Sequence, residues 1–398
     1  MAEYDVVDSP SAYQQAVEAL RSGTGPVGVD AERASGFRYS QRAYLIQMFR
    51  RDAGVFLFDP PALGELTALQ DAVGGVPWIL HAASQDLACL REVGLDPGTI
   101  FDTELGARLL GFPRVGLATI VEELLGIHLA KEHSAADWST RPLPAPWLTY
   151  AALDVELLVD LMEAEQSLLA EAGKETIAAQ EFAFELSRRP KPPRSEPWRR
   201  LSGVHSIRGL RNLAVARELW TARDELARTR DVAPGRLLPD ASITAVAKAM
   251  PTSKRELAAL REFTGRTSRT EIDRWWDAVS RGRTTEDLPV LRATGESIPP
   301  PRVWADRNPE ANERLKAARA AVSEQADELR MPTENLLAPD TLRRLAWSPP
   351  EPISEESIAA AMAEAEARPW QVEATAAKVA AAFVEAGQSP IAPPEAAS

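Results

Sequence analysis

Val27-Gly28-Val29-Asp30-Ala31-Glu32 is a short run of strand-forming residues that ends in two carboxylates. Because side chains two apart in a strand point to the same face, Asp30 and Glu32 are predicted to lie side by side. Two such carboxylates repel each other, and a hard divalent cation such as Mg²⁺ or Mn²⁺ offsets the repulsion. A solvated strand end would show the same two residues, so the stretch indicates a metal site only in combination with others.

Two further segments carry acidic residues that could join this pair. Asp86 closes the segment His81-Ala-Ala-Ser-Gln-Asp86 and is expected in the first turn of a helix that follows a buried strand. Tyr150 and Asp154 are four residues apart, so on a helix they share one face. Taken singly, Asp86 could merely stabilise a helix dipole, and Tyr150 could lie at the edge of a core.

Around these segments, residues 27–185 show strand-like runs followed by helical periodicity, which indicates an α/β sheet domain. Strands are expected at 27–30, 44–49, 55–59 and 78–81. Helices are expected at 84–93, 101–111, 117–125 and 145–172. Within the second of these helices, Asp102 is expected to be an N-cap and not a metal ligand.

The rest of the chain is predicted to be helical and divided by proline-rich segments. Four prolines between positions 188 and 197 are incompatible with a helix or a central strand, so a linker is expected there. Two helical stretches follow, each with a leading tryptophan (Trp198 and Trp304), and they are interpreted as two copies of one module. The expected division is a sheet domain at 1–187, a linker at 188–200, helical modules at 201–285 and 304–386 with a linker at 286–303, and a tail at 387–398.

Charge is unevenly distributed along the chain. Residues 1–187 hold 12 Lys/Arg against 28 Asp/Glu, residues 188–283 hold 22 against 11, and the remainder holds 11 against 19. A basic block of this kind is a candidate for binding a phosphate backbone, in spite of the net charge of −13. An arginine-rich helical surface without a nucleic-acid partner would show the same balance.

Composition excludes several classes of protein. Hydrophobic residues make up 45% of the chain and charged residues 26%, which is enough apolar material for packed cores and excludes a wholly disordered chain. The single cysteine, Cys89, excludes an internal disulfide and a multi-cysteine metal site. No apolar run of membrane-spanning length and no secretory signal pattern are found, so a cytoplasmic location is expected.

In order and spacing, the three acidic segments resemble the exonuclease motifs of the DEDD superfamily in its tyrosine-containing branch, and more closely those of the ribonuclease D family. The similarity extends to Arg42-Ala-Tyr44-Leu-Ile-Gln47, to 101–105 and to 137–143. At Ala82 the chain departs from the Gly or Asn usual in the family, which is expected to be harmless. The stretches after 198 resemble HRDC domains, the first more closely than the second.

The resemblance implies a ribonuclease H-like exonuclease domain, with a mixed sheet flanked by helices, followed by two all-α HRDC-like domains. It further implies a metal-dependent 3′→5′ exoribonuclease that releases 5′-mononucleotides and trims tRNA precursors and other structured RNA. Asp30, Glu32, Asp86 and Asp154 would hold two divalent cations, Mg²⁺ or Mn²⁺, and Tyr150 would orient or help deprotonate the attacking water. The implied partner is RNA with a free 3′ end, without a membrane and without an obligatory protein partner.

Two groups of residues are expected to contact nucleic acid. Trp138 and Arg141 precede the third motif and could stack on a base and bind a phosphate, although they could equally pack beside the motif helix. The second group lies at the start of the basic block. Its members are Trp198, Arg199, Arg200, Arg208 and Arg211.

Two other functions remain open at this point. A 3′→5′ DNA exonuclease would use the same carboxylates, because recognition of the 2′-hydroxyl depends on other residues. A non-catalytic nucleic-acid-binding protein could also be built on a nuclease fold, although such a protein has no need for four acidic residues in motif positions.

Overall fold

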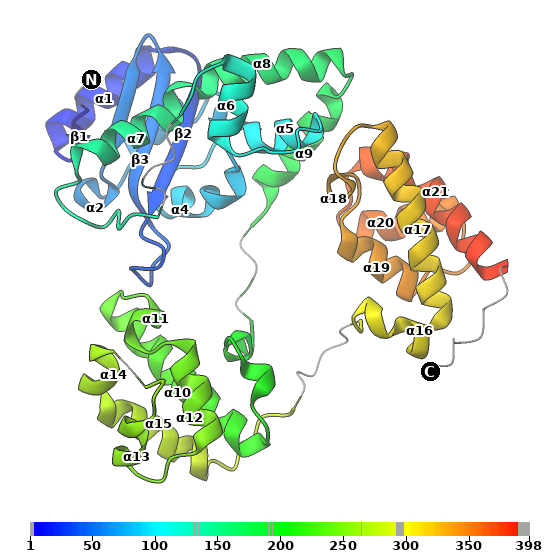
Figure 1. The fold of residues 1–398 in the computed structure, drawn as a ribbon. Coiled ribbons are helices and arrows are strands. Elements are labelled where there is room, and N and C mark those ends of the chain that lie inside the picture. The colour runs from blue at the N-terminus through cyan, green and yellow to red at the C-terminus, as the bar shows by residue number, and fades with distance from the viewer. Residues whose placement is uncertain are drawn as a thin grey trace.

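The computed structural model describes residues 4–129, 133, 135–189, 192, 194–263, 265–291 and 298–388. Figure 1 shows three bodies in chain order, of which the first contains the sheet and the other two are helical. Most of the expected tail, at 389–398, lies outside the described residues, as do positions 190, 191 and 193 of the first expected linker and 292–297 of the second. Within the described residues, no helix is long and apolar enough to cross a membrane.

The first body is built on a six-stranded mixed sheet with the order β1-β4-β3-β2-β5-β6. The central strand β2 pairs antiparallel with β3 and parallel with β5, and Asp30 of β2 lies directly opposite Gln47 of β3. The strands are β1 (Val6–Val7), β2 (Thr24–Arg33), β3 (Ala43–Arg51), β4 (Gly54–Phe58), β5 (Trp78–Leu80) and β6 (Ile100–Asp102). All four expected strands are confirmed. Two strands were not predicted: β1 has only two residues, and residues of β6 were expected to begin the following helix.

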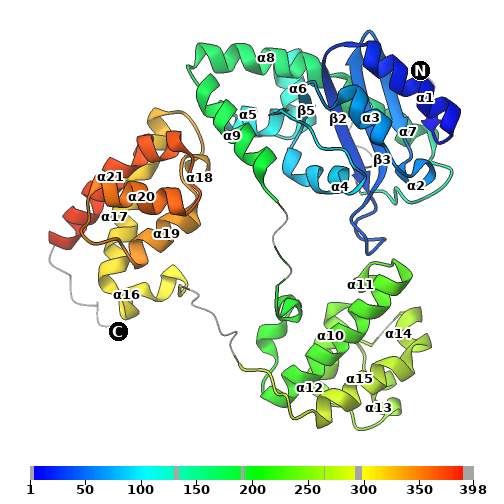
Figure 2. The same ribbon diagram turned by 180° about the vertical axis from the view of Figure 1, so that it is seen from behind.

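Helices cover both faces of this sheet, as Figures 1 and 2 show from opposite sides. On one face α1 and α3 pack against apolar side chains such as Val29, and on the other α7 packs against side chains such as Leu45. The helices are α1 (Pro10–Ser22), α2 (Pro60–Leu63), α3 (Thr67–Val73), η1 (Ala83–Gln85), α4 (Leu87–Glu92), α5 (Thr103–Leu109), α6 (Leu117–Leu125), α7 (Ala145–Glu156), α8 (Leu158–Glu171) and α9 (Glu175–Ser187).

Three of the expected helices in this body need correction. The helix expected at 84–93 is a 3₁₀ turn and an α-helix that meet at Asp86, so this residue is the N-cap position of α4 and does not lie inside a first turn. The helix expected at 145–172 is divided at Leu157 into α7 and α8. The helix expected from 101 begins at Thr103, because the two residues before it belong to strand β6.

The second body is all-α and has its own core. It contains η2 (Pro197–Arg200), η3 (Val204–Ser206), α10 (Leu210–Arg230), α11 (Pro234–Leu237), α12 (Asp240–Ala249), α13 (Lys254–Ala259), α14 (Arg266–Thr270) and α15 (Ile272–Thr284). Trp198 is only 3% exposed and packs in the same core as Leu219 and Trp275. The start of this body therefore includes residues that were expected to belong to the linker.

The second body meets the first at the loop between β2 and β3, which reaches toward α11 in Figure 1. Asp231 accepts hydrogen bonds from the Ser40 backbone N–H (2.8 Å) and the Tyr44 hydroxyl (3.2 Å). The Tyr39 hydroxyl donates to Asp224 at 3.0 Å. The helical body is thus held at one end of the strand pair that carries Asp30.

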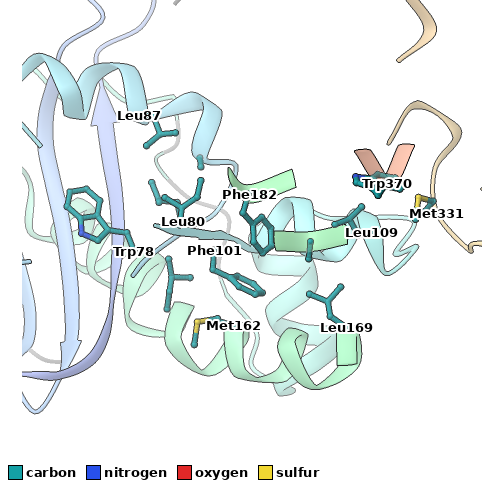
Figure 3. Close-up of a cluster of buried hydrophobic side chains, with 14 of the residues drawn as sticks. Trp78, Leu80, Leu87, Phe101, Leu109, Met162, Leu169, Phe182, Met331 and Trp370 are labelled. Carbon is teal, nitrogen blue, oxygen red and sulfur yellow. The ribbon is translucent and has the colours of Figure 1, made fainter. Parts of the chain in front are cut away.

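The third body is also all-α and packs against the first. It contains η4 (Pro301–Val303), α16 (Trp304–Arg307), α17 (Pro309–Glu328), α18 (Thr333–Leu336), α19 (Pro339–Trp347), α20 (Glu355–Glu364) and α21 (Pro369–Gln388). Figure 3 shows Met331 and Trp370 of this body beside Leu109 of α5, and all three belong to one continuous apolar cluster. The third body is therefore held against the first by buried apolar side chains.

Candidate active site

Strand β2 and helix α7 bring three of the predicted acidic residues together. One carboxylate oxygen from each of Asp30, Glu32 and Asp154 lies within 4.8 Å of the other two. The approach depends on Gly28, which faces the junction of α7 and α8. A Cβ atom at this position would stand 2.8 Å from the backbone oxygen of Val155, so the helix packs this close only because the side chain is absent.

Asp86 reaches the same place from a different element. It occupies the junction of η1 and α4, is 5% exposed, and lines a pocket of about 620 Å³ together with Asp30, Glu32 and Asp154. It does not belong to the tight group of three, but its charge is close enough to raise the pKa of Glu32. All four predicted carboxylates therefore share one pocket, although they come from three separate segments.

Burial and mutual repulsion dominate the electrostatics of the pocket. Burial raises the pKa of Glu32 to about 10, with further contributions from the charges of Asp30, Asp154 and Asp86. Burial followed by the charge of Asp30 raises the pKa of Asp154 to about 8, and the same two causes raise that of Asp86. The cluster thus holds its full negative charge at neutral pH only if cations balance it.

Tyr150 lines this pocket, and its phenol interacts with the carboxylate of Asp154 one helical turn further along α7. Burial, followed by the charges of Asp154 and Glu32, raises the pKa of the Tyr150 phenol. The hydroxyl therefore stays protonated at neutral pH and acts as a hydrogen-bond donor. Its ring packs beside that of Trp138, with 6.4 Å between the ring centroids.

The donor set fits a hard divalent cation. Four carboxylates supply only oxygen ligands, which suits Mg²⁺ or Mn²⁺, and no cysteine lies among the residues that line the pocket. His81 also lines it, but burial lowers the pKa of this imidazole to about 4, and its Nδ1 is engaged with the Thr103 hydroxyl at 2.9 Å. A metal-dependent site is therefore consistent with the four acids and with the neutral imidazole of His81 beside them.

Asp102 supports the segment that carries Asp86. As predicted, it is the N-cap of α5, where its side chain accepts the backbone N–H groups of Glu104 and Leu105. It also accepts those of Ala82 (3.0 Å) and Ala83 (2.8 Å) in the turn that leads to Asp86. The sequence predicted the cap but not the second pair of contacts, because these cross between segments 19 and 20 residues apart.

Two of the predicted nucleic-acid contacts have structural partners. Trp138 is fully buried among the side chains of α7 and β3. The guanidinium of Arg141 is shared between Asp59 (2.5 Å) and the backbone oxygens of Trp138, Thr140 and Tyr44. Neither residue lines the pocket of the four acids, so their proposed contact with RNA has no support from this arrangement.

The five predicted contacts in the second body fall into two groups. Trp198 is buried, Arg199 stacks on its ring and pairs with Glu196, and Arg211 donates to the backbone oxygen of Thr285. Arg200 and Arg208, by contrast, are exposed, and no hydrogen bond or ion pair from either side chain is found within the described part of the chain. These two remain available to a ligand, and the RNA-binding role of all five stays a prediction.

Comparison with protein families assigns each body. Residues 4–169 match the family model described as 3′-5′ exonuclease, and residues 212–279 match that of the HRDC domain. Residues 297–383 match the model described as 3′ to 5′ exonuclease C-terminal domain. The two helical bodies are both all-α, as expected, and the second of them matches a model distinct from that of the HRDC domain.

Individual relatives cover most of the chain. Ribonuclease D of Pseudomonas paraeruginosa is 31% identical over 280 residues, which are 68% of this chain and 70% of that protein. A solved structure of a protein from Bifidobacterium adolescentis is 37% identical, with a TM-score of 0.89, and covers 96% of this chain and 99% of that one. The structure of Escherichia coli RNase D, described as an exoribonuclease involved in structured RNA processing, is 26% identical with a TM-score of 0.68 over 91% of this chain and 98% of that one.

The mixed sheet, the acidic pocket beside its central strand and the matching exonuclease model define a metal-dependent 3′→5′ exonuclease of the DEDD type. The tyrosine one turn before Asp154 agrees with the tyrosine-containing branch of that class. The chain belongs to the ribonuclease D family of 3′→5′ exoribonucleases.

Proposed function

We propose that this protein removes 5′-mononucleotides from the 3′ end of RNA, and that Asp30, Glu32, Asp86 and Asp154 hold two divalent cations, Mg²⁺ or Mn²⁺. The observation that supports this most directly is the convergence of the four carboxylates and Tyr150 in one pocket. A non-catalytic binding protein would gain nothing from such a cluster, because mutual repulsion and burial make it unfavourable without cations.

Each residue of the pocket has a task that follows from its chemistry. When bound, the metal ions would activate water and stabilise charge on the reacting phosphate. The four carboxylates bind and orient the ions from three segments of the chain. Tyr150, protonated beside Asp154, hydrogen-bonds to the attacking water through its hydroxyl oxygen and so orients it.

The proposed substrates are tRNA precursors and other structured RNAs with a free 3′ end. The basic second body, which contacts the first at the loop after β2, supplies positive charge for the RNA backbone without adding to the chemistry of the pocket. Exposed Arg200 and Arg208 are the residues of that body that we propose to contact the RNA backbone. The expected cytoplasmic location stays a prediction, and the proposal requires no protein partner.

Digestion at single-nucleotide resolution tests the proposal. RNA and DNA of one sequence, labelled at the 5′ or the 3′ end, are incubated with Mg²⁺, with Mn²⁺ or with a chelator. We expect a metal-dependent ladder that shortens from the 3′ end of the RNA, with much less digestion of the DNA. Equal digestion of DNA would replace the proposal by a general 3′→5′ exonuclease, and RNA binding without digestion under any metal would replace it by a binding function.

The matched variant is Asp30→Asn, which removes one charge and keeps the size of the side chain. Since Asp30 belongs to a cluster of repelling carboxylates, its loss is expected to abolish digestion without lowering the melting temperature. Full activity of Asp30→Asn would place the active site elsewhere in the chain.

A further inference from the structure

Arg33 lies in the acidic pocket although its position in strand β2 would normally turn it away. Glu32 faces the pocket, so in a regular strand the next side chain would point to the opposite face. Glu32 pairs with Leu45 and Arg33 with Ala43, which leaves Tyr44 as the extra residue of a bulge in β3, so the regular pairing and alternation of β2 end at this point. Glu32 and Arg33 therefore both line the pocket that holds Asp86 and Asp154.

The guanidinium group of Arg33 is only loosely engaged there. Its nearest acidic partner is Asp86, with 3.9 Å between the guanidinium nitrogen and the carboxylate oxygen, which is too long for a hydrogen bond. In the described part of the chain no hydrogen bond from this group is found, and the side chain is 27% exposed. Arg141 and Arg50 of the same body, by contrast, donate hydrogen bonds to carbonyl or carboxylate oxygens.

A half-buried guanidinium with free donors beside a metal-binding cluster is suited to one kind of ligand. Its planar set of N–H groups matches the oxygens of a phosphate. When cations neutralise the surrounding carboxylates, these carboxylates attract the guanidinium less strongly. We propose that Arg33 binds a non-bridging oxygen of the RNA phosphodiester that lies in the pocket. This rests on the proposed function and adds a substrate-binding residue to it.

The simpler role for Arg33 is a permanent counter-ion for Asp86. The two roles differ in what salt does to the reaction. A contact with RNA phosphate releases counter-ions when it forms, so it contributes to the salt dependence of substrate binding, whereas an internal ion pair does not. The test therefore measures a salt slope and not activity alone.

The experiment compares the full-length protein with Arg33→Gln and Arg33→Lys, at saturating Mg²⁺ and between about 50 and 300 mM KCl. The value of kcat/KM is measured for a short single-stranded RNA, and Kd is measured by fluorescence anisotropy for the same RNA with a non-hydrolysable terminal linkage. For Arg33→Gln we expect roughly a tenfold or greater rise in KM and Kd. The slope of log Kd against log salt should fall by about 0.7, the value for one phosphate contact on a single strand. Arg33→Lys should retain the slope and lose part of the affinity.

Arg51→Gln is the matched control, because it removes the same charge from an exposed side chain of the same body that is paired with Asp160 and Glu163. Its slope should equal that of the unmodified protein. An unchanged slope in Arg33→Gln, or an equal change in both variants, would overturn the proposal, and tighter Mn²⁺ binding by calorimetry with no change in Kd for RNA would establish the counter-ion role instead. If the unmodified protein does not digest RNA at all, the proposed function itself is wrong. This result differs from an unchanged salt slope, which overturns only the role of Arg33.

Discussion

At the scale of single residues, removing the hydroxyl group of Tyr150 tests the proposed orientation of the water separately from metal binding. This hydroxyl is protonated beside Asp154, and it is not one of the acids that we propose to bind the metal. We expect Tyr150→Phe to lower kcat by roughly 10- to 100-fold, with little change in the affinity for Mn²⁺. Asp154→Asn should abolish turnover and weaken metal binding. Calorimetric titration with Mn²⁺ beside steady-state kinetics distinguishes the two variants, and a complete loss of activity in Tyr150→Phe would assign the phenol a larger role.

Glu165 on α8 is a second residue whose chemistry can be tested, and it lies outside the acidic pocket. It is fully buried, neither carboxylate oxygen has a hydrogen-bond partner, and burial followed by the charge of Asp102 raises its pKa to about 9. Because its folded-state pKa lies above the unfolded value, its contribution to stability is complete below pH about 4.5 and is lost as the pH rises toward 9.

Glu165→Gln should therefore stabilise the protein at pH 7, by an amount on the order of 2–3 kcal/mol. The gain should shrink as the pH falls from 7 and vanish below about 4.5, because the carboxyl group is then protonated in both states. Denaturant unfolding at several pH values measures this, with Glu163→Gln on the exposed face of the same helix as the control. An equal gain at all pH values would show that charge is not the cause.

At the scale of elements, Asp102 couples the start of α5 to the turn before α4. Ala82 in that turn has φ +63°, a left-handed backbone conformation that costs an alanine roughly 1 kcal/mol and a glycine almost nothing. Four backbone N–H groups converge on the Asp102 carboxylate and hold this conformation in place. The absence of Gly or Asn at position 82 is thus compensated by a residue 20 positions away.

Asp102→Asn replaces one acceptor oxygen by an NH₂ group, and we expect a loss of about 2 kcal/mol in stability and weaker binding of Mn²⁺ through the displaced Asp86. Adding Ala82→Gly should restore part of the Mn²⁺ affinity, since glycine adopts the turn without help. Asn308→Ala is the control, because it removes the N-cap of α17 and so lowers stability at a place remote from the site. If Ala82→Gly restores nothing, Asp102 does not act through this turn.

The scale of elements also shows which features could be predicted from the sequence and which could not. Local period predicted that Asp30 and Glu32 share one face and that Tyr150 and Asp154 share another, and the resemblance to ribonuclease D predicted that Asp86 joins them in one site. The place of Arg33 in the pocket was not predictable, since it depends on how the end of β2 pairs with β3, whose partner residue is ten positions away. Likewise the burial of Trp138 and Trp198 depends on packing partners that an aromatic residue in a basic or polar segment does not reveal.

At the scale of the whole molecule, a buried ion pair joins the third body to the first. Arg368 at the start of α21 donates two hydrogen bonds to Glu181 of α9, at 2.5 and 2.9 Å, and the indole of Trp370 donates a third. Glu181 is only 5% exposed. Removing Arg368 would leave a buried carboxylate without its charge partner. We expect this to lower the free energy of unfolding by about 3–5 kcal/mol.

We expect Arg368→Ala to detach the third body without unfolding it, because α17 and α21 also pack against each other. Hydrogen exchange should then increase at α9 and around Leu109, and scattering should show a larger radius of gyration. Lys378→Ala removes an exposed charge from the same helix and should change neither. An unchanged exchange pattern in Arg368→Ala would show that apolar burial alone holds the contact.

Gly28 limits the substitutions that such a protein can accept during evolution. In the middle of a sheet, local preference favours a β-branched residue over glycine, which gives up side-chain packing and adds flexibility to the unfolded chain. Here every larger residue is closed off by the backbone oxygen of Val155, 2.8 Å from where the first carbon would stand. The position carries no reactive group, yet it is as constrained as the acids beside it, so part of the information that specifies the active site is stored as the absence of atoms.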